Sequence, residues 1–127
     1  MAFWLFMLAA VLLTPGVMIV FGGRFIKHPP DKINSTYGYR TAMSMKNRDT
    51  WIFAHRYCGK LWQRLGWTLG ALSTAAMGFA WGRDIGSIGI FGGAIACVQC
   101  LVLLLSIAYV ERALKKNFDK NGNKKGV

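Results

Sequence analysis

The segment Ile85–Val110, with the sequence IGSIGIFGGAIACVQCLVLLLSIAYV, contains no charged residue. Two other uncharged apolar segments accompany it, at Ala2–Gly23 and roughly at Leu65–Trp81. A helix needs about 20 mostly apolar residues to cross the ~30 Å hydrocarbon core of a bilayer. Because every backbone N–H and C=O must be paired internally in hydrocarbon, such segments form helices. The sequence therefore predicts an all-α integral membrane protein with transmembrane helices at residues 1–23, 65–82 and 85–110.

The charged residues predict how these helices are oriented. The chain of 127 residues carries a net charge of +11, although 54% of it is hydrophobic. Nine of its 16 Lys and Arg residues lie in the loop 24–64, six lie in the tail 111–127, and Arg83 lies in the turn before the last helix. Short loops rich in Lys and Arg stay in the cytoplasm. We therefore expect the N-terminus outside, and the loop and the basic tail in the cytoplasm.

Composition also argues against several functions. Direct nucleic-acid binding is not expected, because membrane topology already explains the basic segments. Such segments attract anionic lipid, so membrane lipid is an expected partner. The odd number of cysteines does not suggest a disulfide framework. Cys97 and Cys100 have the spacing of a redox pair, but inside an apolar helix we expect them to pack in the core.

The loop 24–64 is predicted to contain an amphipathic helix. His28-Pro29-Pro30 should end the first helix. Asn47 should cap a new one, with Asp49 in its positively charged first turn. Spacings of three and four then give a less polar stripe of Trp51, His55, Cys58, Trp62 and Leu65, and a basic face of Arg56, Lys60 and Arg64. We expect this helix at the cytoplasmic interface, either ending there or running straight into the second span.

Small residues within the apolar segments predict close helix packing. They recur at intervals of four, as in Gly66 and Gly70, Gly78 and Gly82, and the line Gly89, Gly93 and Cys97. Such surfaces let helices approach closely, either within the chain or between protomers. Since three helices make a thin bundle, we expect a homo-oligomer.

Three further residues and the tail carry expectations about local structure. Pro15 should kink the first helix, because proline removes a backbone hydrogen bond. Gln99 and Ser106 are polar at membrane depth, so they should form hydrogen bonds across helices. The tail beyond Phe118 is rich in Lys, Asn and Gly, and we expect it to be frayed or disordered.

Candidate functional residues gather between Asn34 and Gly59, where they would meet at the cytoplasmic membrane surface. One interpretation is structural: the segment folds the loop against the bundle, with Arg40 paired with Asp49 or with helix C-terminal carbonyls. The other is a surface that binds a peptide, a lipid headgroup or a cytoplasmic partner. An enzyme is not expected, because the chain has only two histidines and five acidic residues, without metal-ligand or paired-carboxylate spacing. We therefore expect no metal and no cofactor.

A series of short motifs occupies this segment: Tyr37-Gly38-Tyr39-Arg40-Thr41, Ser44-Met45-Lys46-Asn47, Thr50-Trp51, Ala54-His55 and Gly59-Lys60-Leu61. The pattern resembles the SdpI-like family of bacterial membrane immunity proteins, which are associated with the sporulation-delaying killing toxin. The resemblance covers roughly Ile33–Leu69, and the two following apolar segments fit the family's arrangement. It nominates ten residues as a family motif for binding: Asn34, Gly38, Tyr39, Arg40, Thr41, Ser44, Asn47, Trp51, His55 and Gly59.

The resemblance implies a function in toxin resistance. Members of the family protect the producing cell from a peptide that attacks the membrane, and some hold a cytoplasmic repressor at the membrane when toxin is present. It implies a multi-pass protein of the bacterial inner membrane that binds or excludes such a peptide and docks a regulator. The alternative is a small oligomeric transporter or lipid-interacting protein that uses Arg40 and His55 to contact anionic headgroups. Because the motif is expected inside, a toxin arriving from outside would first meet the N-terminus and the turn at Arg83.

Overall fold

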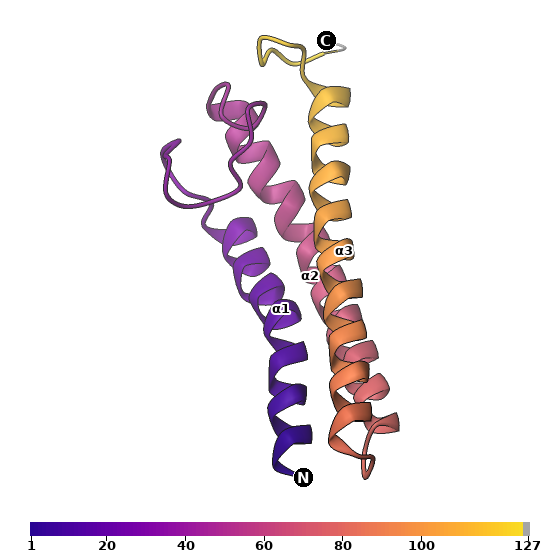
Figure 1. The fold of residues 1–127 in the computed structure, drawn as a ribbon. Coiled ribbons are helices and arrows are strands. Elements are labelled where there is room, and N and C mark those ends of the chain that lie inside the picture. The colour runs from indigo at the N-terminus through magenta and orange to yellow at the C-terminus, as the bar shows by residue number, and fades with distance from the viewer. Residues whose placement is uncertain (126–127) are drawn as a thin grey trace.

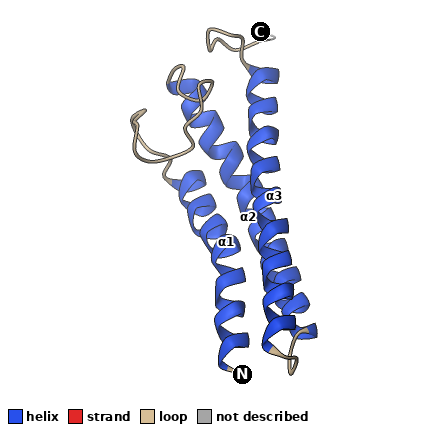
Figure 2. Ribbon diagram, in the orientation of Figure 1, coloured by secondary structure: helices blue, strands red, loops and turns tan. Residues whose placement is uncertain are grey.

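The computed structural model describes residues 1–125 and contains three helices, α1 (Ala2–Lys27), α2 (Arg48–Phe79) and α3 (Ile85–Asn117). They form an elongated bundle with the N-terminus at one end (Figure 1). The loop between α1 and α2 and the residues after α3 lie at the other end (Figure 1). No strand is present within the described residues (Figure 2). The only strand-like pairing among them is an isolated bridge between Phe118 and Lys124. The prediction of an all-α fold is confirmed.

Two of the helices are suited to a bilayer. α1 and α3 are long and apolar enough to cross a membrane, by length and composition. Much of their apolar surface points away from the bundle: Leu13 is 67% exposed on α1, and Leu104 is 64% exposed on α3. Exposed apolar surface on this scale is costly in water and favourable in lipid. α2 is different, since its first half carries charged residues.

The start of α2 follows from local chemistry. The side-chain oxygen of Asn47 accepts a hydrogen bond from the Thr50 N–H, and the Thr50 hydroxyl accepts one from the Asn47 N–H, which completes a capping box. Asp49 lies in the first turn, as predicted. The helix then continues without a break to Phe79, so the predicted amphipathic helix and the second apolar segment are one element. Its less polar stripe faces the bundle, with Cys58 fully buried.

Glycines bring α1 and α2 into close contact. A Cβ on Gly59 would lie 2.6 Å from the Gly22 carbonyl oxygen, and one on Gly22 would lie 2.9 Å from the Gly59 carbonyl oxygen. A Cβ on Gly66 would lie 2.7 Å from the side chain of Ile19. The two backbones therefore cross at a distance that only glycine permits. The predicted packing role of Gly66 is confirmed.

Polar side chains join all three helices in the apolar region. α1 stays helical through Pro15, which has no N–H to offer to the carbonyl of Val11 one turn earlier. The amide nitrogen of Gln99 donates to this Val11 oxygen at 2.6 Å and to the Ser73 hydroxyl oxygen at 2.8 Å. The hydroxyl of Ser106 accepts a hydrogen bond from the Trp62 indole at 3.1 Å. Both predicted inter-helix hydrogen-bonding residues are thus confirmed.

Two expectations about α3 and the tail are wrong. Cys97 and Cys100 are exposed on the outside of the bundle. The face of α3 that carries the buried Gln99 is turned inward, and the two cysteines lie outside this face. The tail after Phe118 is not frayed throughout: within the described residues, the Asp119 N–H donates to the Asn123 carbonyl at 2.8 Å and closes a turn. Phe118 itself is 3% exposed and packs in the core at this end of the bundle.

Candidate functional site

The loop between α1 and α2 folds back over one end of the bundle, and His55 of α2 holds it there. The ring Nδ1 of His55 lies 2.7 Å from the Trp51 carbonyl oxygen, and its Nε2 accepts a hydrogen bond from the Tyr39 N–H at 2.9 Å. A carbonyl can only accept and an N–H can only donate, so these partners require the neutral tautomer with its proton on Nδ1. His55 is therefore a backbone acceptor for the loop.

Aromatic packing surrounds the same histidine. The rings of Trp51 and Phe25 lie 4.3 Å and 4.9 Å from the His55 ring, centroid to centroid. His55 is fully buried, and this burial lowers its pKa, although the hydrogen bond to the Trp51 carbonyl acts in the opposite direction. The indole N–H of Trp51 donates to the Pro30 carbonyl at 2.8 Å, which ties the start of the loop to α2.

Gly38 makes the contact between Tyr39 and His55 possible. Its φ of +113° lies in a region that other residues adopt only with strain. A Cβ at this position would also lie 2.5 Å from the Nε2 of His55. Any side chain here would therefore both strain the backbone and displace the ring that accepts the Tyr39 N–H.

Tyr39 connects the loop to α3. Tyr39 is 7% exposed, and its hydroxyl donates to the Ile107 carbonyl at 3.2 Å. Burial, with a smaller contribution from the nearby carboxylate of Glu111, raises the pKa of the phenol far above its usual range. The hydroxyl therefore stays protonated and acts as a donor.

A compact turn follows Tyr39. The hydroxyl oxygen of Ser44 accepts a hydrogen bond from the Thr41 N–H at 2.9 Å, and the Thr41 hydroxyl oxygen accepts one from the Ser44 N–H at 3.1 Å. The Ser44 hydroxyl lies 3.0 Å from the Tyr39 carbonyl oxygen, to which it can donate. Thr50 of α2 donates to the Ser44 carbonyl at 3.0 Å. These bonds place the turn directly on the start of α2.

Asn34 and Asn47 organise the two ends of the segment. The side-chain oxygen of Asn34 accepts hydrogen bonds from the N–H groups of Thr36 at 3.0 Å and Tyr37 at 2.7 Å, which forms a local turn. Besides capping α2, Asn47 donates its amide N–H to the Gly122 carbonyl at 2.7 Å. The C-terminal tail is thereby attached to the motif.

Arg40 is the exception among the motif residues, because its side chain is exposed. Its guanidinium donates to the carbonyl of Ser35, within the same loop. The expected pairing with Asp49 or with helix C-terminal carbonyls is therefore wrong. Tyr39 is buried, and the side chain of the next residue, Arg40, is exposed.

The ten motif residues thus have distinct surroundings. Tyr39, Ser44, Trp51, His55 and Gly59 are buried, Asn34, Gly38, Thr41 and Asn47 are partly buried, and Arg40 is exposed. The structure adds contributors outside the ten nominated residues, namely Thr50, Gly22 and Gly122. Thr50 had a usable signal, since a hydroxyl residue three positions after Asn47 can complete a cap. Gly22 and Gly122 had none, because their partners are distant in sequence.

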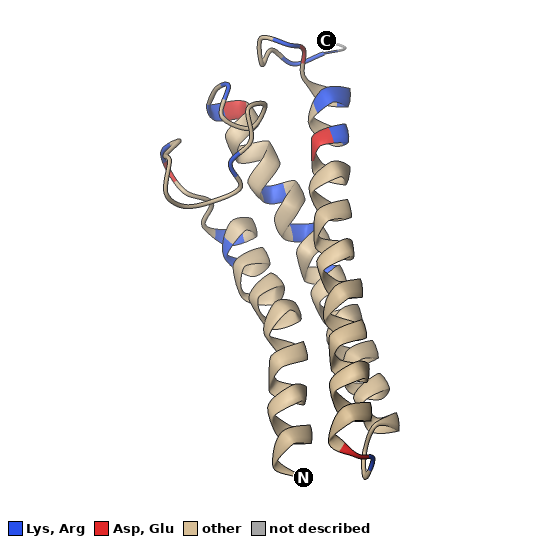
Figure 3. Ribbon diagram, in the orientation of Figure 1, with Lys and Arg blue, Asp and Glu red and all other residues tan. Residues whose placement is uncertain are grey.

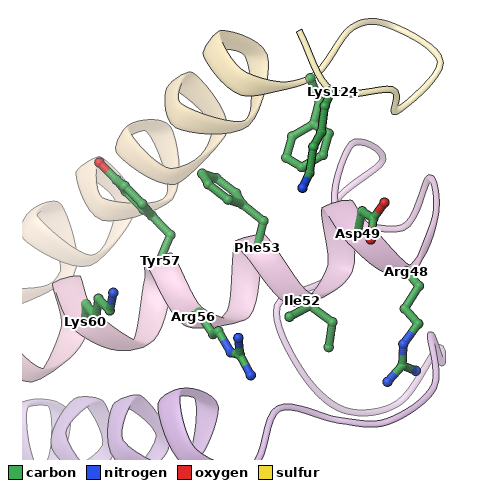
Figure 4. Close-up of a pocket in the computed structure, with 9 residues that line it drawn as sticks. Arg48, Asp49, Ile52, Phe53, Arg56, Tyr57, Lys60 and Lys124 are labelled. Atoms are coloured by element: carbon green, nitrogen blue, oxygen red, sulfur yellow. The ribbon is translucent and has the colours of Figure 1, made fainter. Parts of the chain in front are cut away.

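Two hollows lie on either side of the first half of α2. The hollow between α2 and the tail encloses about 420 Å³. Phe53 and Tyr57 point into it, and Lys124 reaches it from the tail (Figure 4). We call the other the α1–α2 hollow; it encloses about 460 Å³ between the end of α1, the loop and α2. Arg48 and Arg56 line both.

The structure is a helical bundle that is closed at one end by a polar loop. Because two of its helices are apolar enough to cross a membrane, the fold indicates a helical membrane protein. The chain belongs to the SdpI/YfhL protein family, whose model matches residues 31–110. It is also similar to Uncharacterized protein YfhL of Bacillus subtilis (strain 168), with 35% identity over 88 residues, which cover 69% of this chain and 76% of that protein. No solved structure gives a significant match.

Proposed function

We propose that the protein crosses the membrane three times, with the N-terminus outside and both basic segments in the cytoplasm. The distribution of charge supports this arrangement. Lys and Arg gather at the end of the bundle that carries the loop and the tail, and only Arg83 and Asp84 mark the opposite end (Figure 3). The second half of α2, from Leu65 onward, is uncharged and lies alongside the other helices. Its basic first half then lies at the cytoplasmic interface.

We infer that the protein protects its cell from a membrane-active toxin peptide. Membership of the SdpI/YfhL family carries this inference, because the matched residues 31–110 include the motif whose resemblance implies immunity. Binding, rather than catalysis, is the proposed activity. No cofactor enters it, and the homo-oligomer expected because three helices make a thin bundle is part of the same proposal.

The geometry supports different roles for the motif end of the bundle and for the end at Arg83 and Asp84. Most motif residues form contacts within the protein, as His55 and Tyr39 do. The motif therefore supplies a rigid cytoplasmic end, on which the exposed Arg40 can contact a regulator. The peptide is intercepted by the membrane helices or by the external end around Arg83 and Asp84, which a toxin from outside reaches first.

A survival assay tests this function. A sensitive bacterial strain expressing the protein is challenged with a toxin peptide of the sporulation-delaying type, beside a strain with an empty vector. We expect more survivors with the protein, and a loss of protection in His55→Ala because the loop loses its acceptor. Arg40→Ala should keep protection, since this side chain is exposed. Membrane abundance, measured by immunoblot, controls for expression, and equal survival with and without the protein contradicts the proposal.

The alternative of a lipid-interacting protein is favoured by one observation. Basic residues line two hollows at the end of the bundle where the apolar surface stops. Anionic headgroups are attracted to such surfaces. This interaction is compatible with immunity, because lipid binding can anchor the end of the bundle that carries the motif.

A further inference from the structure

The α1–α2 hollow collects cations from two helices that are distant in sequence. Arg24 and Lys27 come from the last turn of α1, and Arg48 and Arg56 come from the first half of α2. Among the described residues that line it, Asp31 alone carries a carboxylate. The folded loop therefore brings cations of two helices to one surface.

One of these cations is already positioned by the loop. A guanidinium N–H of Arg48 donates to the carbonyl oxygen of Asp31 at 2.6 Å. A guanidinium has five N–H donors in a fixed plane, so this bond leaves others available for a ligand. Two oxygens of a phosphate or carboxylate match the spacing of two parallel N–H groups. The site therefore favours an oxyanion over a simple halide.

The position of the hollow relative to the membrane indicates where that oxyanion comes from. The uncharged part of α1 ends at Gly23, and Arg24 and Lys27 follow it immediately. The hollow therefore opens where hydrocarbon gives way to headgroups. Phospholipid phosphates lie at this level, so the ligand would already be concentrated beside the site.

We propose that the α1–α2 hollow binds the phosphate of an anionic phospholipid headgroup, such as phosphatidylglycerol, from the cytoplasmic leaflet. Arg24, Arg48 and Arg56 supply the donors. One other basic surface is less suited. The surface at Arg112, Lys115 and Lys116 takes its cations from α3 alone. The proposal rests on the membrane placement given above, and not on protection from a toxin.

Native mass spectrometry of the full-length protein tests it, after extraction in neutral detergent with equal amounts of phosphatidylglycerol and phosphatidylcholine. The wild type should retain phosphatidylglycerol in preference to phosphatidylcholine. Combining Arg24→Gln, Arg48→Gln and Arg56→Gln should weaken phosphatidylglycerol retention by about tenfold or more, because three charge contacts are lost. A matched control that combines Arg112→Gln, Lys115→Gln and Lys116→Gln removes the same charge from α3 and should change retention by less than about twofold.

Further arms separate a built site from general attraction. Arg56→Lys, which keeps the charge but loses the paired N–H groups, should retain more binding than Arg56→Gln. This comparison keeps the test valid if the triple variant loses its helical circular dichroism. Equal losses in the two triple variants, or equal retention of the two lipids, would overturn the proposal. Displacement of the lipid by millimolar inorganic phosphate would overturn its lipid source. A failed survival assay would leave this result unaffected.

Discussion

At the residue scale, the motif works by pairing polar backbone groups of the loop with side chains of α2. Loop backbone placed over a bundle end must find partners for its N–H and C=O groups. His55 accepts from the Tyr39 N–H, Thr50 donates to the Ser44 carbonyl, and Trp51 donates to the Pro30 carbonyl. These residue types are needed for their hydrogen-bonding geometry, which gives the motif a structural role.

The buried His55 predicts a dependence of stability on pH. Burial places its pKa in the folded protein below the ordinary value of 6.5. As the pH falls through 6.5, the unfolded chain takes up a proton before the folded protein does, so the free energy of unfolding decreases. The stabilisation is complete above this pH and is lost progressively toward the lower folded pKa.

Unfolding in detergent at about pH 7.5 and about pH 5.5 measures this effect. The wild type should be less stable at the lower pH. His55→Gln, which cannot titrate at this position, should have a smaller difference between the two conditions. An unchanged difference would assign the pH dependence to other groups.

Two neighbouring tyrosines provide a matched pair for hydrogen bonding. The hydroxyl of Tyr39 donates to the Ile107 carbonyl, whereas the hydroxyl of Tyr37 is a buried polar atom without a partner among the described residues. Tyr39→Phe should therefore lower the free energy of unfolding by about 1 kcal/mol. Tyr37→Phe should be neutral or slightly stabilising, because it removes an unpaired buried group. Equivalent losses in both, measured by denaturant unfolding, would contradict these assignments.

At the element scale, α2 is the helix on which the others assemble. Its first half presents the motif, and its glycines at 59 and 66 receive α1. Gln99 of α3 satisfies the Val11 carbonyl that Pro15 leaves free in α1, and it also contacts Ser73 of α2. The proline is thus tolerated because another helix supplies the missing donor.

The close crossing of α1 and α2 predicts contrasting effects of alanine. Gly59→Ala places a Cβ 2.6 Å from the Gly22 oxygen, so it should destabilise the bundle by about 1–3 kcal/mol through overpacking. Gly89→Ala in α3 meets nothing within 4 Å and should be neutral or stabilising by up to about 1 kcal/mol. Unfolding in mixed micelles compares the two, and a harmless Gly59→Ala would rule out the backbone contact.

The elements could be predicted from the sequence to the extent that local chemistry decides them. The Asn47 cap, the break after Lys27 and the polar roles of Gln99 and Ser106 follow from short-range patterns. The pairing of Tyr39 with His55 could not be derived, because it joins residues 16 apart in the chain through a loop with no periodicity. The absence of periodicity also left no pattern from which to predict that Arg40 donates to the Ser35 carbonyl and not to Asp49.

At the scale of the whole molecule, the account depends on which side of the membrane carries the motif. The loop and the tail contact each other through Asn47 and Gly122, so they lie on one side together. Arg83 marks the opposite end (Figure 3). The proposed function, the regulator surface and the lipid site all require the motif end to be cytoplasmic.

Cysteine accessibility in intact cells tests this requirement most directly. Arg40→Cys and Arg83→Cys are each placed in a background in which Cys58, Cys97 and Cys100 are replaced by alanine, and both positions are exposed in the structure. A membrane-impermeant maleimide should modify the probe at position 83 in intact cells, and the probe at position 40 only after the cells are permeabilised. Labelling of position 40, but not of position 83, in intact cells would contradict the account.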